Sequence, residues 1–361
     1  QLLNGKFQGT TKVPGDKSIT HRALMLGALS NGSTHIKSPL ISADTLRTFE
    51  NMRQLGAEVT RIGDDFKVVS KGHTELHSPA ETIYTGNSGT TTRLITGLLA
   101  GLNQITATVE GDATIAKRPM DRVVIPLSQM GAQISLKNKK YPRVKIQPAA
   151  LQPIEYKMPI ASAQVKSAIL FGGLFTKGET VVHETHTSRN HSEIMMAQFG
   201  ADIKVENNTV ILQGGNALTA ADVVVPGDIS SAAFLIVLAL ITKDADVTIE
   251  NVSLNDTRSG IIDVVKEMGG DITITPHDSD GETFGDINVK YTEQLKPFAI
   301  DGSIIPRLID EIPILAVLAA FADGDSTVKG AKELRFKETD RITAVITELT
   351  KFGIAFDEYE D

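Results

Sequence analysis

Residues 45–57 read Thr45-Leu46-Arg47-Thr48-Phe49-Glu50-Asn51-Met52-Arg53-Gln54-Leu55-Gly56-Ala57, and the pattern of this segment recurs along the chain. Apolar residues at helical spacing lead to a glycine, which suits the left-handed residue that closes a helix. The same pattern ends at Gly131, Gly200, Gly269 and Gly353, with spacings of 75, 69, 69 and 84 residues between successive glycines. A period of this length indicates a protein built from repeated units.

Each copy follows a second expected helix, and that helix begins with small or polar residues. These helix starts are Asp16-Lys17-Ser18, Asn87-Ser88-Gly89-Thr90, Ser162-Ala163-Gln164, Asp228-Ile229-Ser230-Ser231 and Asp310-Glu311. Asp, Asn and Ser are common N-caps, and β-rich runs such as Thr180-Val181-Val182 lie between the helices. The sequence therefore predicts an α/β fold with five repeats of about 70 residues, each containing two helices and several strands.

A second recurrence predicts two domains. The segment Val13-Pro14-Gly15-Asp16 is echoed by Val225-Pro226-Gly227-Asp228. Each could be an ordinary Pro-Gly turn, but their registration with the repeats favours two hinge strands. We expect one domain at residues 13–225 and a second made of 1–12 and 226–361, with hinges near 12–15 and 224–228. Three repeats lie between the echoes and two follow, so we expect a sixth repeat to be missing from this chain.

Composition excludes several classes of protein. The 361 residues carry a net charge of −8, and only 5% are aromatic, which disfavours a nucleic-acid or membrane-surface partner. The absence of cysteine excludes disulfides, thiolate metal sites and a cysteine nucleophile. The longest apolar run, residues 232–241, is too short to span a bilayer. We therefore expect a cytoplasmic protein.

The helix starts are candidate anion sites, because free N–H groups and the helix dipole favour phosphate or carboxylate there. Plain helix caps are the alternative for any single start. Cations near three of them favour the anion sites: Lys17 and Arg22 at the first, Arg93 at the second and Lys166 at the third. The glycine-rich segment 86–93 lacks the Gly-Lys-Ser/Thr ending of a nucleotide-binding loop, which disfavours a kinase.

Further charged clusters stand at residues 117–122 and 188–193, and the guanidinium groups in them suit bidentate contacts with phosphate or carboxylate. The histidines at 183, 186 and 191 lack a carboxylate at helical ligand spacing, so we expect no metal. The last constellation combines Asp310 with the segment Lys337-Glu338-Thr339-Asp340-Arg341. It is either a cap plus a surface ion-pair ladder, or a set of carboxylates and cations tuned for proton transfer.

Taken together, the motifs resemble the family of 5-enolpyruvylshikimate-3-phosphate synthase, from near the N-terminus to the end of the chain. The matching segments are 16–22 (Asp-Lys-Ser-Ile-Thr-His-Arg), 86–90 (Gly-Asn-Ser-Gly-Thr), 118–120 (Arg-Pro-Met), 162–166 (Ser-Ala-Gln-Val-Lys) and 337–341 (Lys-Glu-Thr-Asp-Arg). Residues 189–193 and 255–258 resemble the subgroup called class II, many members of which tolerate the inhibitor glyphosate.

The resemblance implies a two-domain enolpyruvyl transferase fold, in which each domain has three βαβαββ repeats and two hinge strands join the domains around a cleft. The implied reaction adds the 5-hydroxyl of shikimate 3-phosphate to C2 of phosphoenolpyruvate and then eliminates phosphate, a step of aromatic amino acid biosynthesis. It implies no metal or organic cofactor, no partner beyond these two substrates, and a monomer. A sixth repeat with an Asn-Asp-His-Arg-type segment has no counterpart in this chain.

The resemblance also implies roles for individual residues. The catalytic residues would be Lys17, which assists proton transfer, Asp310, which accepts the proton of the 5-hydroxyl, and Glu338, which exchanges a proton at the methylene carbon. The implied ligands of shikimate 3-phosphate are Lys17, Ser18, Arg22, Ser162, Ala163, Gln164, Arg189, Asp310 and Lys337. The implied ligands of phosphoenolpyruvate are Lys17, Gly89, Arg118, Gln164 and Arg341.

Three alternatives remain beside this interpretation. The related transferase that uses a UDP-sugar usually carries a reactive cysteine and Lys-Asn at the first motif, whereas this chain has no cysteine and Lys17-Ser18. A truncated, non-catalytic anion-binding protein on the same repeats is the second. An RNA-end processing protein is the third, and the negative charge and the scarcity of aromatic residues disfavour it.

Overall fold

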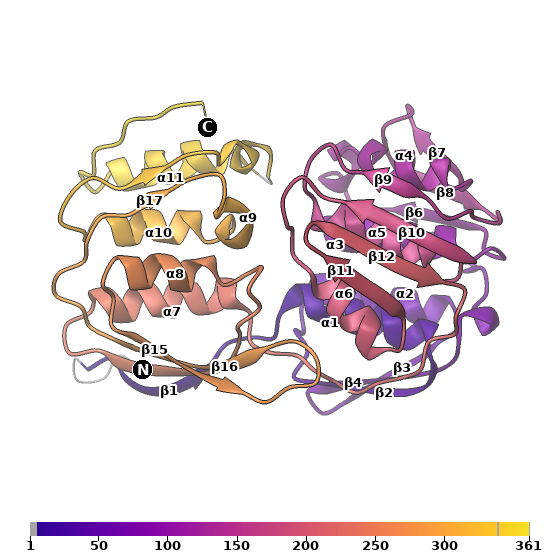
Figure 1. Cartoon of the computed structure of the whole chain (residues 1–361), viewed down its shortest axis with the longest axis horizontal. Helices are drawn as coiled ribbons and strands as arrows, with labels where there is room; N and C mark the ends of the chain where they lie inside the picture. The colour runs from indigo at the N-terminus through magenta and orange to yellow at the C-terminus, as the bar shows by residue number, and fades with distance from the viewer. Residues whose placement is uncertain (1–5, 338, 361) are drawn as a thin grey trace. The chain divides into compact units, whose positions relative to one another are not determined.

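The computed structural model describes residues 6–337 and 339–360, and the chain divides into two compact units (Figure 1). Unit 1 contains the described residues up to Pro14 and those from Pro226 onward, and unit 2 runs from Gly15 to Val225. Each unit has a hydrophobic core of its own. The chain thus enters unit 2 at the first Val-Pro-Gly segment and leaves it at the second. That these segments act as hinges stays a prediction.

Unit 2 contains three sheets of four strands each, with the orders β13-β2-β4-β3, β5-β6-β8-β7 and β11-β12-β10-β9. Their strands are β2 (Asn31–Lys37), β3 (Glu58–Ile62), β4 (Asp65–Lys71), β5 (Ile83–Tyr84), β6 (Ala107–Glu110), β7 (Gln133–Lys137), β8 (Tyr141–Gln147), β9 (Glu155–Lys157), β10 (Gly178–His183), β11 (Asp202–Glu206), β12 (Thr209–Gly214) and β13 (Val223–Val224). In every sheet one pair of strands is parallel and the other two pairs are antiparallel. Identical pairing in three consecutive segments is the mark of a repeat.

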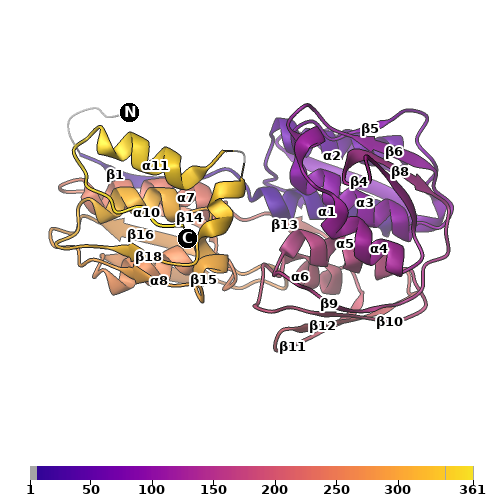
Figure 2. The same cartoon turned by 90° about the horizontal axis from the view of Figure 1, so that it is seen from above.

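The helices of unit 2 lie inside, and the sheets lie outside them (Figure 2). They are α1 (Lys17–Leu29), α2 (Ala43–Gln54), α3 (Gly89–Gly101), α4 (Asp121–Gln129), α5 (Ala163–Gly173) and α6 (His191–Gln198), with the short 3-10 helices η1 (His73–Glu75) and η2 (Ile115–Lys117). Most residues of α1, α3 and α5 are buried. Close packing of α3 on α5 requires glycine, because a Cβ at Gly97 would lie 2.2 Å from the carbonyl oxygen of Ala168.

Unit 1 contains a four-stranded sheet of order β1-β14-β16-β15 and a parallel pair, β17-β18. The strands are β1 (Gln8–Lys12), β14 (Asp246–Ser253), β15 (Ile272–His277), β16 (Phe284–Lys290), β17 (Ala299–Ile300) and β18 (Thr327–Val328). The helices are α7 (Ile229–Ile241), α8 (Gly260–Glu267), α9 (Ile305–Leu308), α10 (Ile312–Ala319), the 3-10 helix η3 (Lys332–Phe336) and α11 (Arg341–Thr350). Within the two described ranges, no helix is long and apolar enough to cross a membrane.

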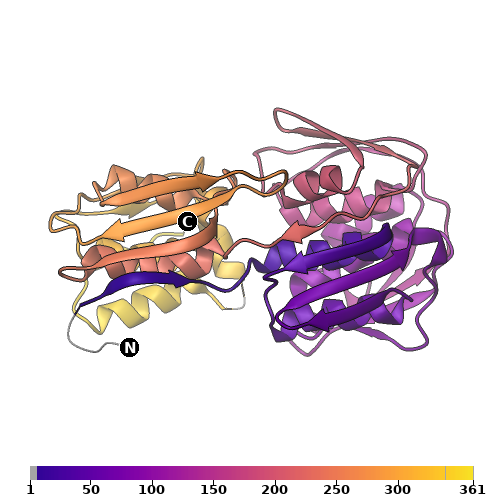
Figure 3. The same cartoon turned by 90° about the horizontal axis from the view of Figure 1, so that it is seen from below.

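The two crossings of the chain exchange strands between the repeats. Strand β1 precedes α1 of unit 2 but pairs with β14 of unit 1, beside which it lies in Figure 3. Strand β13 precedes α7 of unit 1 but pairs with β2 of unit 2. In each unit, one edge strand of a sheet is therefore formed by the segment that leads into the first helix of the other unit.

The predicted helix ends are confirmed at all five glycines. Gly56, Gly131, Gly200, Gly269 and Gly353 follow α2, α4, α6, α8 and α11, and their φ angles lie between 78° and 105°. This left-handed conformation is the one that glycine adopts without strain. Four of the predicted helix starts carry the expected side-chain cap, at Asp16, Ser88, Ser162 and Asp228.

The fifth predicted helix start differs from expectation. The N-cap of α10 is Glu311, and its side chain makes no capping hydrogen bond. The carboxylate of Asp310, one residue earlier, lies against three cationic side chains instead. The expectation of a capping carboxylate at this position is therefore wrong, because charge pairing holds it elsewhere.

Candidate active site

The first helix start of unit 2 presents Lys17. Asp16 caps α1 by accepting a hydrogen bond from the backbone N–H of Ile19 at 2.9 Å, so Lys17 and Ser18 occupy the first turn. The Lys17 side chain is about half exposed, and its Nζ lies 3.5 Å from Oδ2 of Asp44 in the first turn of α2. Sequence reasoning did not single out Asp44, because its pairing with Lys17 depends on how α1 packs against α2.

Arg22 joins three helices of unit 2. Its buried guanidinium donates from Nε to Ser192 Oγ at 2.8 Å, from Nη2 to Ser167 Oγ at 2.7 Å, and from Nη1 to the carbonyl oxygen of Ser18 at 3.0 Å. Ser167 in turn donates to the carbonyl oxygen of Ala163 at 2.6 Å. The first turns of α1, α5 and α6 are therefore held in register by one cation.

The second and third helix starts also meet. A Cβ at Gly89 would lie 3.0 Å from Nη1 of Arg118, so glycine lets that guanidinium approach the start of α3. Gln164 at the start of α5 donates to Thr90 Oγ1 at 3.0 Å and accepts from Nη1 of Arg93. The helix starts therefore gather side chains that can bind phosphate or carboxylate.

We call this group the unit 2 cluster: Lys17, Ser18, Arg22, Gly89, Arg118, Ser162, Ala163 and Gln164. Ser162 is its N-cap residue at α5. Arg189, the remaining predicted residue of unit 2, lies two residues before α6, whose Ser192 contacts Arg22.

Lys166 does not belong to the unit 2 cluster. Its side chain is 1% exposed, and its Nζ lies 2.7 Å from Glu184 Oε2 and 2.6 Å from Glu193 Oε1. Burial raises the pKa of the Glu193 carboxyl, and the adjacent Lys166 partly offsets that rise. The expectation that Lys166 adds a cation to an anion site is wrong, because two buried carboxylates already occupy its ammonium group.

Burial also determines the charge of His21, which lies on α1 between Lys17 and Arg22. Burial, followed by the positive charges of Lys17 and Arg22, lowers the pKa of His21 to about 3, although Asp16 opposes the shift. The ring is therefore neutral at physiological pH, and its Nδ1 lies 2.8 Å from Thr48 Oγ1.

A second group of predicted residues converges in unit 1. Oδ1 of Asp310 lies 3.1 Å from Nη1 of Arg341 and 3.8 Å from Nζ of Lys337. Oδ2 of the same carboxylate lies 3.6 Å from Nη1 of Arg258. We call Asp310, Arg258, Lys337 and Arg341 the unit 1 cluster. Glu338, the third predicted catalytic residue, lies outside the described residues.

Arg258 is a member that sequence reasoning did not assign to the site. The segment 255–258 was recognised only as typical of a subgroup. The Arg258 side chain is 5% exposed, and its Nη2 donates to Ser230 Oγ at 2.9 Å and to Asp228 Oδ1 at 3.3 Å. Its partners come from segments far apart in the sequence, so neither the motif at 255–258 nor the helix start at 228–231 showed that they meet.

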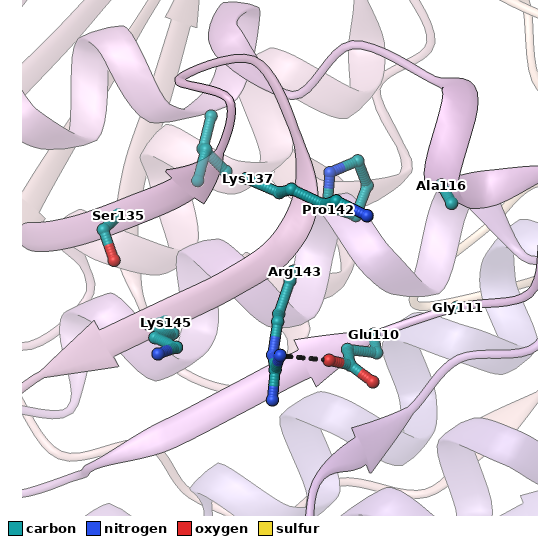
Figure 4. Close-up of a pocket in the computed structure, with 9 residues that line it drawn as sticks. Glu110, Gly111, Ala116, Ser135, Lys137, Pro142, Arg143 and Lys145 are labelled. Carbon is teal, nitrogen blue, oxygen red and sulfur yellow. Dashed lines mark ion pairs between the residues drawn. The ribbon is translucent and has the colours of Figure 1, made fainter.

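The described residues form a cavity away from the predicted site and no metal site. Among them, no group of three or more His, Cys, Asp or Glu side chains could hold a metal ion. A cavity of about 490 Å³ lies at the sheet β5-β6-β8-β7 and is lined by nine residues that include Lys137, Arg143 and Lys145 (Figure 4). Arg143 in this cavity pairs with Glu110 at 2.7 Å. No predicted site residue lines the cavity, so it is not the candidate active site.

Comparison with known proteins agrees with the motifs. The model of the family "EPSP synthase (3-phosphoshikimate 1-carboxyvinyltransferase)" matches residues 3–361. A 3-phosphoshikimate 1-carboxyvinyltransferase from Staphylococcus carnosus is 45% identical over 361 residues, which are 99% of this chain and 83% of the relative. The enzyme of that name from Bacillus licheniformis is 47% identical over 357 residues, covering 98% of this chain and 83% of the relative.

Solved structures support the same assignment. An EPSP synthase from Acinetobacter baumannii superimposes with a TM-score of 0.91 at 42% identity, covering 98% of this chain and 80% of that one. The enolpyruvyl transferase NikO from Streptomyces tendae shares the fold with a TM-score of 0.69 at 16% identity, over 90% of this chain and 75% of its own. The predicted enolpyruvyl transferase fold is confirmed by these matches. With the family model matching nearly every residue, the chain belongs to the EPSP synthase family.

Proposed function

We propose that this chain transfers the enolpyruvyl group of phosphoenolpyruvate to the 5-hydroxyl of shikimate 3-phosphate and releases phosphate. The observation that carries the proposal is the unit 1 cluster, in which a carboxylate able to take a proton lies 3.1 to 3.8 Å from three cations. Both substrates are phosphorylated carboxylates, so an acidic protein must concentrate cations where it binds them. Family membership supports the same reaction.

The unit 2 cluster supplies most of the proposed substrate ligands. Ser18 and Arg22 bind the carboxylate of shikimate 3-phosphate, and the start of α5 binds the ring and the 3-phosphate through Ser162, Ala163 and Gln164. Arg189 and Lys337 complete the phosphate contacts. Gly89, Arg118 and Arg341 bind phosphoenolpyruvate, and Lys17 contacts both substrates. Backbone N–H groups at a helix start and planar guanidinium groups are the donors that such anions require.

The chemistry has two stages. In the addition, the 5-hydroxyl oxygen bonds to C2 of phosphoenolpyruvate, its proton passes to Asp310, and the electrons of the double bond take up a proton at C3 from Glu338. In the elimination, the bond between C2 and the phosphate oxygen breaks, phosphate leaves with the electron pair, and C3 returns a proton to restore the double bond. Both stages of the reaction need an acid group and a base group at neighbouring atoms.

Phosphate release tests the proposal directly. The chain is incubated with both substrates and, in matched controls, with each substrate omitted, while calorimetry follows the binding of shikimate 3-phosphate alone. We expect phosphate release only when both substrates are present, together with a product whose mass equals shikimate 3-phosphate plus the enolpyruvyl group. Release that persists without shikimate 3-phosphate would indicate simple hydrolysis and contradict the proposal. A UDP-sugar in place of shikimate 3-phosphate tests the alternative acceptor.

A further inference from the structure

The two oxygens of the Asp310 carboxylate face different kinds of cation. Oδ1 lies near Arg341 and Lys337, whose side chains are 26% and 29% exposed. Oδ2 lies 3.6 Å from Nη1 of Arg258, whose side chain is 5% exposed. One side of the carboxylate thus meets accessible cations that a ligand can reach, and the other side meets a buried one.

The other terminal nitrogen of the Arg258 guanidinium, Nη2, is held by the protein. It donates to Ser230 Oγ and to Asp228 Oδ1, and Asp228 also accepts the N–H of Ser230 at 2.8 Å as the cap of α7. Ser230 Oγ donates to Glu311, the residue that follows Asp310. A guanidinium fixed by two acceptors on a helix start loses little further freedom when it also contacts Asp310.

We propose that Arg258 is the positioning residue of the catalytic base: it holds Oδ2 of Asp310 through an ion pair at 3.6 Å, so that Oδ1 can accept the proton of the attacking hydroxyl once the substrates engage Arg341 and Lys337. This inference rests on the proposed function, in which Lys337 and Arg341 bind the anionic groups of the substrates. Once they do, they can no longer neutralise Asp310 to the same extent. Arg258 then remains as the cation that keeps the carboxylate ionised, and a protonated carboxyl could not accept a proton.

The charges around Asp310 come from four segments. Among the described residues they are Arg258 before α8, Lys337 directly after η3 with Arg341 at the start of α11, Asp228 at the start of α7, and Glu311 beside Asp310. Of the two acidic neighbours, Asp228 contacts Arg258 and Glu311 contacts Ser230, so the Arg258 guanidinium offsets the charge of Asp228 next to Asp310. Removing the guanidinium therefore takes away an attraction and uncovers a repulsion, and both effects favour protonation of Asp310.

The test compares Arg258→Gln with Lys290→Gln, which removes one positive charge from strand β16 of the same unit. We expect Arg258→Gln to lower kcat by roughly 10- to 100-fold with KM for both substrates changed by less than about threefold. The acid limb of the pH profile of kcat should move to higher pH by about one unit, since an opposite charge at this distance shifts the pKa of a carboxyl by roughly that much or more. Arg258→Lys keeps the charge and should restore the position of the acid limb. Guanidinium ion added to Arg258→Ala should restore part of kcat.

Several results would overturn the inference. One is an acid limb that stays in place in Arg258→Gln, and another is a fall in kcat that guanidinium does not reverse in Arg258→Ala, since both indicate a structural role only. If Arg258→Gln fails to fold, Arg258→Lys and the guanidinium experiment decide. A readout independent of turnover is the ¹³C titration of the Asp310 carboxyl, assigned with Asp310→Asn, in the presence of shikimate 3-phosphate and inorganic phosphate. Its midpoint should rise in Arg258→Gln, and an unchanged midpoint refutes the inference even if the proposed reaction itself is not observed.

Discussion

The buried ion triad of Lys166, Glu184 and Glu193 gives the most direct test of how unit 2 is held together. The three side chains are 1%, 2% and 4% exposed, and both Nζ–carboxylate distances are below 2.8 Å. Lys166 lies four residues after the N-cap of α5, and Glu193 lies in the first turn of α6, so the triad ties these two helix starts together. The perturbation is Lys166→Met, which keeps most of the volume and removes the charge.

The magnitude follows from the two carboxylates that remain. Removing one partner of a buried ion pair costs about 3–5 kcal/mol, because the other charge stays buried without compensation. A domain has a total free energy of unfolding of only about 5–15 kcal/mol, so the variant loses a large share of it. Replacing Glu193 as well, in Lys166→Met/Glu193→Gln, removes one of the two uncompensated charges and should restore roughly half of the loss.

Acid should weaken the effect of Lys166→Met. Burial raises the pKa of the Glu193 carboxyl, and the substitution removes the cation that opposes this rise. The folded variant then binds a proton at Glu193 more readily than its unfolded chain does, so protonation of Glu193 offsets part of the lost stability as pH falls. The destabilisation measured at pH 5 should therefore be smaller than at pH 8.

Urea unfolding followed by far-ultraviolet circular dichroism measures these differences, since the chain has no tryptophan to report by fluorescence. Lys71→Met, at an exposed position of β4, is the matched control and should change stability by less than about 0.5 kcal/mol. A loss below about 1 kcal/mol for Lys166→Met at pH 8, or a double variant no more stable than the single one, would refute the reasoning.

The repeat architecture could be predicted from the sequence because its signals are local. A glycine that ends a helix and a polar residue that starts one act within a few positions, and the five glycines have the expected positive φ angles. The exchange of strands could not be predicted in the same way. All five residues of β1 are exposed, so no alternation of apolar residues marks the strand, and its partner β14 lies more than 200 residues later.

The candidate site likewise contains some residues that could be predicted from the sequence and others that could not. Motif residues such as Lys17 and Arg341 could be selected because each belongs to a short recognisable segment. The burial of Lys166 and the contacts of Arg258 could not, since their carboxylate partners come from other segments and only the packed structure brings them together. A cation near a helix start looks the same in sequence whether it faces a ligand or a buried carboxylate.

Three further predictions concern unit 2. Lys17→Met should lower phosphate release by more than about 100-fold, and near-normal turnover at saturating substrate would remove Lys17 from the chemistry. Gly97→Ala should lower stability by about 3 kcal/mol in urea unfolding, because its Cβ would lie 2.2 Å from the Ala168 carbonyl oxygen, and an unchanged midpoint would contradict the close contact. The last concerns His21, whose pKa of about 3 lies below the ordinary value of 6.5, so that between these pH values the unfolded chain binds a proton that the folded chain does not. His21 should therefore lower the free energy of unfolding by about 1.4 kcal/mol for each pH unit below 6.5. His21→Gln should remove this part of the dependence of stability on pH. If the two proteins lose stability equally as pH falls, His21 already titrates in the folded state.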